Sequence, residues 1–293
     1  MSSGPIVFGT YDQAGLDAQY NNRALVPDYA RYFTRWREES LAVRARLEAR
    51  LGLAYGADER ERLDVFPAPG KDVPTLLFLH GGYWQALDRS DFSYPAASWV
   101  AAGVAFAAAS YPLAPKATMD EIVDAAQRAA LWVRGHARDW GGDPERVFCA
   151  GHSAGGHLVA MLMTAGDAGP GRGGSPVRGG IALSGLYDLE PIRLSYLNAG
   201  LGLDRDMARR NAPLERGQGA AGSLLLAVGA EESPEFLRQN QAMARLWRDR
   251  SLPLTEVAMP GLHHFSAVDA LAEPAHPLFQ AAFRLVTGAD RGM

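Results

Sequence analysis

The segment Gly151-His152-Ser153-Ala154-Gly155 lies between a short apolar run, Val147 to Ala150, and a run with helical spacing, Gly155 to Thr164. The pattern G-x-S-x-G between a strand and a helix is typical of a nucleophile elbow, a tight turn that lifts a serine hydroxyl above a sheet. Small residues flank the serine because bulkier ones would collide with neighbouring elements. The positive end of the following helix also lies near the hydroxyl. The segment therefore predicts that Ser153 is a nucleophile in an α/β fold.

Extended and helical patterns alternate along the rest of the chain. Apolar or β-rich runs that predict strands are Leu63 to Phe66, Thr75 to Leu79, Val104 to Ser110, Gly180 to Leu183, Ser223 to Val228 and Leu254 to Ala258. Helical spacing occurs in Asp28 to Arg50, Met119 to Arg138, Pro234 to Arg250 and His276 to Val286. This alternation predicts a mostly parallel central sheet with helices on both faces, where ligands bind at the carboxyl ends of the strands.

The domain organisation follows from the same pattern. We predict a single domain over residues 1–293, with an N-terminal helical segment at 1–60 and a candidate cap insertion at 190–216. The stretch from Gly166 to Gly180 is rich in Gly, Pro and Arg. Because regular elements resume on both sides of it, it is expected to be a flexible surface loop rather than a domain linker. The N-terminal segment and the insertion are both candidates to cover the site.

A second motif, His80-Gly81-Gly82-Tyr83-Trp84, follows the predicted strand Thr75 to Leu79. An H-G-G motif after an early strand is typical of an oxyanion hole, because glycines let backbone N–H groups approach the developing negative charge. Ala154, the residue after the nucleophile, is the expected second donor. We interpret His80 as structural, and His152 and His157 as packing or hydrogen-bonding residues.

The acid and the base are expected after two late strands, because the triad in this arrangement runs Ser, acid, His. Glu231 and Glu232 compete for the acid, and the loop spacing after Gly229 favours Glu232. His263 and His264 compete for the base, and we favour His264. In the predicted mechanism Ser153 attacks a carbonyl, His264 transfers the proton and Glu232 orients the imidazole. No cofactor and no metal is required.

Composition excludes several other classes. The net charge is −4, so no basic field is available to attract a nucleic acid. Cys149 is the one cysteine, so no intramolecular disulfide can form and zinc sites built on cysteine pairs are absent. Residues 1–15 do not resemble a signal peptide and no apolar stretch is long enough for a membrane span, so we expect a cytoplasmic protein with no membrane partner.

With these residues in place, the chain resembles an α/β-hydrolase of the esterase/lipase type, and within it the serine-type kynurenine formamidase (arylformamidase) family. The resemblance runs from about Tyr11 to the C-terminus. Its motifs are the H-G-G-Y-W loop, G-H-S-A-G-G-H-L from Gly151, S-G-L-Y-D-L from Ser184, S-P-E-F from Ser233 and the His264-Phe265 pair. The H-x-G-T-H-x-D signature of metal-dependent formamidases is absent.

The resemblance implies hydrolysis of N-formyl-L-kynurenine to L-kynurenine and formate, through an acyl-enzyme. It assigns the triad to Ser153, Glu232 and His264. It further assigns the oxyanion donors to Gly82, Tyr83 and Ala154, with Gly81 shaping the turn. Glutamate stands where eukaryotic members commonly have aspartate, so the histidine loop must sit slightly differently. A homodimer is a further expectation, since many relatives dimerise.

The substrate is expected to be a small aromatic formamide or ester. Tyr83, Trp84 and Phe265 are candidates for a wall that stacks on the aromatic leaving group, although core packing explains the loop aromatics equally well. The segments Tyr20 to Arg23 and Tyr187-Asp188 are candidates to bind the amino-acid end. A carboxylesterase or another amide or carbamate hydrolase is the alternative, because the same triad serves them all. A non-catalytic binding protein would be expected to have lost part of the triad.

Overall fold

The computed structural model describes residues 4–166 and 175–288, and eight strands of this part form one sheet. Along the chain they are β3 (Arg50–Ala54), β4 (Arg62–Phe66), β5 (Val73–Leu79), β6 (Ala105–Ala109), β7 (Gly142–His152), β8 (Gly179–Leu183), β9 (Ser223–Gly229) and β10 (Leu254–Met259). Their spatial order is β10-β9-β8-β7-β5-β6-β4-β3. Pairing is parallel from β10 to β6, whereas β4 is antiparallel to both of its neighbours. The predicted mostly parallel sheet is confirmed.

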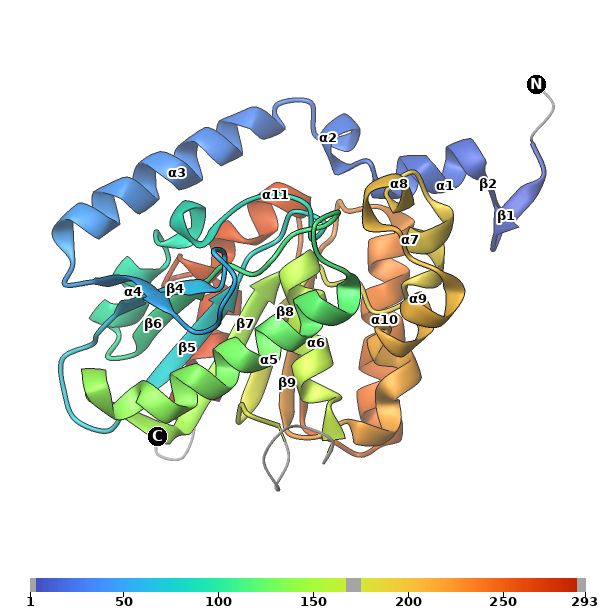
Figure 1. The fold of residues 1–293 in the computed structure, drawn as a ribbon. Helices are drawn as coiled ribbons and strands as arrows, with labels where there is room; N and C mark the ends of the chain where they lie inside the picture. Colours follow the sequence, from blue (N-terminus) through green and yellow to red (C-terminus); the bar gives the residue numbers. More distant parts are fainter. Residues whose placement is uncertain (1–3, 167–174, 289–293) are drawn as a thin grey trace.

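Helices cover both faces of the sheet (Figure 1). On one face lie α5 (Met119–His136), α6 (Ala154–Met163) and α10 (Pro234–Asp249); on the other lie α4 (Ala96–Ala101) and α12 (Pro277–Thr287). The helix α5 begins with a capping box, in which Thr118 accepts from the Glu121 amide and the Glu121 carboxylate binds the Thr118 amide. Such a box pairs two amides that would otherwise lack partners, so it fixes where the helix starts.

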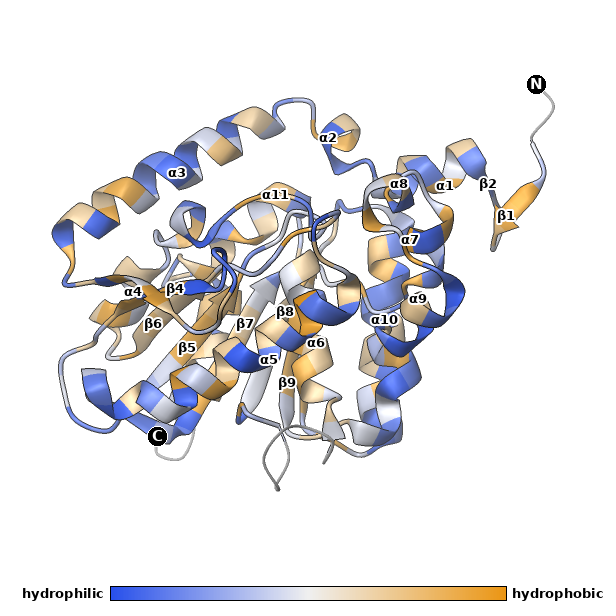
Figure 2. Cartoon of the chain, viewed as in Figure 1, coloured by the Kyte–Doolittle hydropathy of each residue, from blue (hydrophilic) through white to orange (hydrophobic). Residues whose placement is uncertain are grey.

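Alternate residues of the strands supply two hydrophobic cores. In β5, Leu77 and Leu79 belong to the core beneath α5 and α6, whereas Leu76 and Phe78 belong to the core beneath α4 and α12. Successive side chains of a strand point to opposite faces, so a strand covered on both sides must be apolar throughout. Figure 2 shows hydrophobic residues in the sheet and hydrophilic ones on the outer sides of α3, α5 and α10.

The N-terminal segment is less helical than the sequence suggested. It contains a two-stranded sheet, β1 (Ile6–Phe8) and β2 (Tyr11–Asp12), followed by α1 (Gln13–Tyr20), α2 (Asn22–Leu25) and α3 (Tyr29–Arg46). The helix predicted to reach Arg50 ends at Arg46, and Arg50 begins the edge strand β3. Residues of β3 are mostly exposed, so they carry no buried pattern that separates them from a helix. Figure 1 shows α2 and α3 passing over the end of the sheet where α11 (His264–Ala267) lies.

The candidate cap insertion at 190–216 forms α7 (Glu190–Leu194), α8 (Asn198–Leu201), α9 (Arg205–Arg210) and the start of the 3-10 helix η4 (Pro213–Gly219). Figure 1 shows these helices grouped beside α10. Shorter 3-10 helices are η1 (Arg89–Phe92), η2 (Ala137–Trp140) and η5 (Asp269–Leu271). Residues 167–174 of the predicted Gly166 to Gly180 loop lie outside the described residues.

Candidate active site

Ser153 lies at the turn between β7 and α6, with φ 57° and ψ −120°. A positive φ is strained for a residue with a side chain, and surrounding contacts must hold it. The Ser153 amide donates to Leu183 O at 2.8 Å. An added Cβ at Gly151 would lie 2.3 Å from Gly155 O, and one at Gly155 would lie 1.9 Å from Leu79 O. Both positions therefore require glycine, because strand, turn and helix approach too closely for any side chain.

We expect Gly155→Ala to destabilise the protein by about 3 kcal/mol or more, because the methyl group would overlap the backbone of β5. The measurement is the free energy of unfolding in urea. Gly135→Ala is the matched control, since Gly135 lies in α5 with no atom within 4 Å of an added Cβ. The free energy of unfolding of this control should rise by up to about 1 kcal/mol, because alanine has a higher helix propensity than glycine. Unchanged stability of Gly155→Ala would contradict the packing described for the turn.

Three buried side chains form a chain of hydrogen bonds that ends at Ser153. The Ser153 hydroxyl lies 3.0 Å from His264 Nε2, and His264 Nδ1 lies 2.6 Å from Glu232 Oε2. Glu232 follows β9 and His264 begins α11, so the three residues come from the carboxyl ends of β7, β9 and β10. Glu231, the other candidate acid, is exposed and contacts neither histidine. The geometry matches a nucleophile, a base and an acid that orients the base.

The second oxygen of Glu232 is also bound. Glu232 Oε1 accepts from the Gly229 amide at 2.8 Å and from the Ser184 hydroxyl. These bonds fix the carboxylate so that Oε2 faces His264. Ser184 has φ 49°, which turns its side chain toward Glu232 after β8. The sequence singled out Ser184 only as part of a resemblance motif, and no local signal predicts its contact with Glu232.

Two neighbouring histidines, His263 and His152, form hydrogen bonds that hold the backbone around His264. His263 caps α11, since its Nδ1 accepts from the amides of Phe265 and Ser266, and its Nε2 lies 3.0 Å from the Tyr32 hydroxyl. His152 Nε2 donates to His264 O at 2.9 Å. Burial, together with the nearby His264, holds the pKa of His152 well below its usual range. His152 is therefore a neutral donor that holds the backbone of His264.

The loop after β5 presents free backbone amides to the elbow. Gly82, Tyr83 and Trp84 all have positive φ, at 105°, 50° and 57°. An added Cβ at Gly81 would lie 3.0 Å from His152 O and 3.2 Å from Ser153 Cβ, so the loop lies directly against the turn. Within the described residues, the amides of Gly82, Tyr83 and Ala154 donate to no other group. These amides are available to a developing oxyanion.

Trp84 does not form part of a substrate wall, which corrects the expectation from the sequence. Its side chain is fully buried, and its Nε1 donates to His157 Nδ1 at 3.2 Å. The successive positive φ angles send Trp84 into the core while Tyr83 lines the pocket. Tyr187 is buried as well, and Asp188 pairs with Arg238 at 3.1 Å away from the pocket, so neither residue reaches the site.

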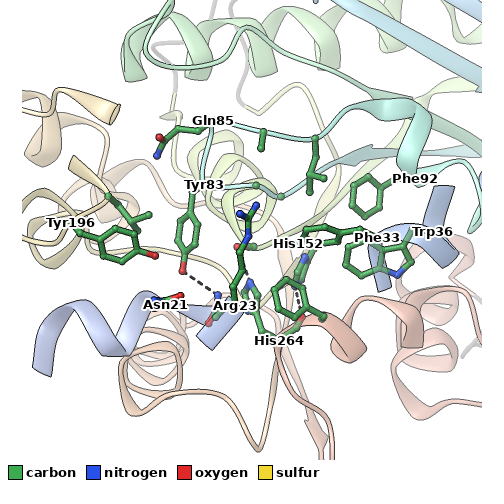
Figure 3. A pocket seen from close by; sticks show the side chains of 18 residues that line it. Asn21, Arg23, Phe33, Trp36, Tyr83, Gln85, Phe92, His152, Tyr196 and His264 are labelled. Atoms are coloured by element: carbon green, nitrogen blue, oxygen red, sulfur yellow. Dashed lines mark hydrogen bonds between the residues drawn. The ribbon is translucent and has the colours of Figure 1, made fainter. Parts of the chain in front are cut away.

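The Ser153 hydroxyl opens into a cavity of about 400 Å³. Figure 3 shows Asn21, Tyr83, Gln85 and Tyr196 on one side of this cavity and the apolar rings of Phe33, Trp36 and Phe92 on the other. Its aromatic walls are Phe33, Trp36, Phe92 and Phe265, and its polar lining includes Asn21, Asn22, Arg23, Tyr83, Gln85 and Tyr196. The N-terminal segment thus supplies both kinds of wall. Of the insertion at 190–216, Tyr196 and Leu197 line the cavity, so its role as a cap stays a prediction.

Among residues 4–166 and 175–288, no cluster of three or more His, Cys, Asp and Glu side chains is placed to hold a metal ion. Within that same part, no helix is both long and apolar enough to cross a membrane. The expected cytoplasmic location and the expected homodimer stay predictions.

Comparisons with known proteins agree with this geometry. The model of the alpha/beta hydrolase fold family matches residues 76–212. A candidate thioesterase of known structure from Silicibacter sp. tm1040 is 32% identical and superposes with a TM-score of 0.80, over 93% of this chain and 98% of that one. The chain belongs to the α/β-hydrolase family.

Two further relatives of this α/β-hydrolase are named after an enzymatic activity. Kynurenine formamidase of Salmo salar is 29% identical over 278 residues, which is 92% of this chain and 93% of that protein. Esterase LipQ of Mycobacterium tuberculosis is 28% identical over 235 residues, which is 72% of this chain and 56% of that protein. This hydrolase is therefore similar in sequence, over most of its length, both to a formamidase and to an esterase.

The stability of the α/β-hydrolase should fall in acid because of His157. Trp84 donates to its Nδ1, so its Nε2 carries the proton and donates to Asn211 O at 2.8 Å. Burial lowers the pKa of His157 to about 4. The unfolded chain takes up a proton near pH 6.5 and the folded chain only near pH 4. Stability present at pH 7 is therefore lost as the pH falls from about 6.5 toward 4.

We expect the free energy of unfolding to drop by about 2–3 kcal/mol per such histidine between pH 7 and 4.5. Urea unfolding at the two pH values measures this. His157→Gln should be less stable at pH 7 and should lose less on acidification. His136→Gln, which removes an exposed histidine of α5, is the control variant. A His157→Gln variant with the native pH dependence would refute the assignment.

Proposed function

We propose that this α/β-hydrolase is a serine hydrolase that cleaves aryl formamides, with N-formyl-L-kynurenine converted to L-kynurenine and formate. The observation that carries this proposal is the hydrogen-bonded chain from Ser153 through His264 to Glu232, which opens into a pocket walled by aromatic rings. The formamidase relatives support the choice of a formamide. An aryl ring can pack against such walls while the formyl carbon lies at the serine.

In the proposed first step, Ser153 Oγ attacks the formyl carbon while His264 Nε2 accepts the hydroxyl proton. The oxyanion that forms accepts hydrogen bonds from the amides of Gly82, Tyr83 and Ala154. Each such donor is typically worth about 2.7–4 kcal/mol of transition-state stabilisation. Glu232 stabilises the imidazolium and keeps the ring in place.

Collapse of this intermediate breaks the bond between the formyl carbon and the aryl nitrogen. His264 then returns its proton to the departing nitrogen, which leaves as the aromatic amine. The formyl-serine ester that remains is attacked by a water, with His264 again as the base. Formate leaves and Ser153 regains its proton. The proton transfers of Ser153, the departing nitrogen and the attacking water pass through His264, the remaining acidic proton of the product is released to solvent as formate forms, and no redox change occurs.

The second candidate is a carboxylesterase, which the similarity to LipQ favours. The same groups would act on an ester, and the cavity of about 400 Å³ has room for an acyl group larger than formyl. Ester and amide differ in the leaving group, because an amine must be protonated as it departs whereas many alkoxides need less help. The distinction therefore lies in the substrate and not in the triad.

The deciding experiment compares kcat/KM for N-formyl-L-kynurenine and p-nitrophenyl acetate on one preparation. We expect about 10⁴ M⁻¹s⁻¹ or more for the formamide, well above the ester. Ester turnover with negligible formamide turnover would instead identify a carboxylesterase. If neither substrate is cleaved and no covalent serine probe labels the protein, the hydrolase assignment to this site is wrong.

A further inference from the structure

The lining of the catalytic cavity carries a single formal charge. Among the described residues that line it, Arg23 is the one Arg, Lys, Asp or Glu, and the remainder are aromatic, aliphatic or neutral polar. His152 lines the same cavity, but burial keeps its pKa well below the usual range, so it is neutral near pH 7. Glu232 lies behind His264 and is not part of the lining. The cavity therefore offers a positive charge with no counter-charge on its own walls.

The position of Arg23 is fixed by contacts on both sides of it. Asn21 caps α2 by accepting from the Ala24 amide at 3.2 Å. Asn22 donates to the Tyr83 hydroxyl at 3.1 Å, and that hydroxyl donates to Tyr20 O at 2.7 Å. The backbone next to Arg23 is thus tied to the loop that lies against the Ser153 turn.

The guanidinium itself lies over aromatic rings rather than against an acid. Its carbon is 5.3 Å from the ring centre of Tyr29 and 5.9 Å from that of Phe33. Within the described chain it has no ion pair and no hydrogen bond from its side chain. Figure 3 shows the side chain reaching into the pocket, between Tyr83 and Phe33 in that view. Such stacking orients the planar group and leaves its N–H donors free for a ligand.

We propose that Arg23 binds a carboxylate on the substrate and so makes this hydrolase selective for aromatic substrates that carry a carboxylate. A guanidinium without a partner favours a carboxylate, which it can bind through two parallel hydrogen bonds. The location of that carboxylate rests on the proposed function. A formyl group carries no carboxylate, so the carboxylate must belong to the leaving amine. An amino acid attached to the aryl ring meets this requirement.

The size of the effect is limited by solvent, because Arg23 is exposed at the mouth of the pocket. Water and salt screen a charge there, so we expect a preference of about 10-fold to 100-fold rather than an absolute requirement. Since the carboxylate is distant from the reacting carbon, its binding is the same in the ground state and the transition state. Loss of Arg23 should therefore raise KM and leave kcat nearly unchanged.

The test uses Arg23→Gln with N-formyl-L-kynurenine and with N-formylkynuramine, which lacks the carboxylate. We expect KM to rise at least 10-fold for the first substrate. For the second, which carries an ammonium and no carboxylate, KM should stay unchanged or fall. Arg23→Lys should keep part of the preference. Arg245→Gln, at an exposed arginine of α10 outside the pocket, is the matched control and should behave as the native protein. Equal losses on both substrates, or no loss on either, would overturn the role of Arg23.

A second pair of substrates separates this inference from the proposed function. 4-Acetoxybenzoate and its methyl ester are both aryl acetates, and only the first has a charged leaving group. If formamides are not cleaved, Arg23→Gln should still abolish the preference for the charged ester. In the native protein, salt raised from 20 to 500 mM should reduce that same preference. A native protein that prefers the carboxylate-bearing substrate in neither pair would refute the inference.

Discussion

Ser153→Ala should lower kcat by roughly five to six orders of magnitude. The loss is this large because the variant lacks the atom that forms the covalent intermediate, and water is not held at the position of Oγ. The Ser153 hydroxyl is hydrogen-bonded to His264, and its removal takes away a single atom, so the variant creates little space and should keep the fold intact. Steady-state kinetics on N-formyl-L-kynurenine and on an aryl acetate measures the effect.

The same variant supplies two controls. A fluorophosphonate probe should label the native protein and fail to label Ser153→Ala, while the thermal unfolding temperature stays within a few degrees. The double variant Ser153→Ala, His264→Ala should be no slower than either single variant, because nucleophile and base act as one unit. Additive losses, or near-native turnover by Ser153→Ala, would show that the nucleophile is another residue.

Glu232→Gln should lower kcat by about 10³–10⁴-fold. An amide in place of the carboxylate can present N–H to His264 Nδ1, which favours the ring form that cannot accept a proton from Ser153. It also removes the negative charge that stabilises the imidazolium. Gln keeps a carbonyl oxygen that can accept from the Gly229 amide, so the fold should survive.

Glu231→Gln is the matched control for this variant. Glu231 is the adjacent residue, has the same side chain and is exposed, so its substitution should change kcat less than 2-fold. Comparison of the two variants at fixed pH tests which carboxylate orients the base. A larger loss in Glu231→Gln than in Glu232→Gln would move the acid by one residue.

The meeting of Ser153, Glu232 and His264 could be predicted because each residue follows the carboxyl end of a strand. In a mostly parallel sheet these ends meet at one edge, so residues far apart in sequence were expected to lie together. The choice between neighbours depended on loop spacing: Glu232 faces inward in the turn after β9, whereas Glu231 faces solvent. The glycines at Gly81 and Gly155 also predicted the turn and the loop beside it, because positions where backbones approach closely favour glycine.

Other features of the site could not be predicted from the sequence. Trp84 and Tyr83 are adjacent aromatics in one loop, and only their backbone angles decide which lines the pocket. The contact between Ser184 and Glu232 joins two loops and follows no local pattern. The N-terminal segment was a candidate cover, but its specific rings, Phe33 and Trp36, could not be placed in the cavity because helical periodicity does not say which partner a face meets.

The walls of the candidate catalytic pocket come from segments that lie far apart along the chain. Tyr32 of α3 bonds to His263, which is 231 residues away along the chain, and Arg23 and Phe33 share a cavity with His264. During synthesis on the ribosome, the N-terminal wall exists long before the base that completes it. The nascent protein is therefore expected to have no working site until β10 and α11 have emerged. A chain that terminates before α11 would lack His264 and is expected to have no hydrolase activity.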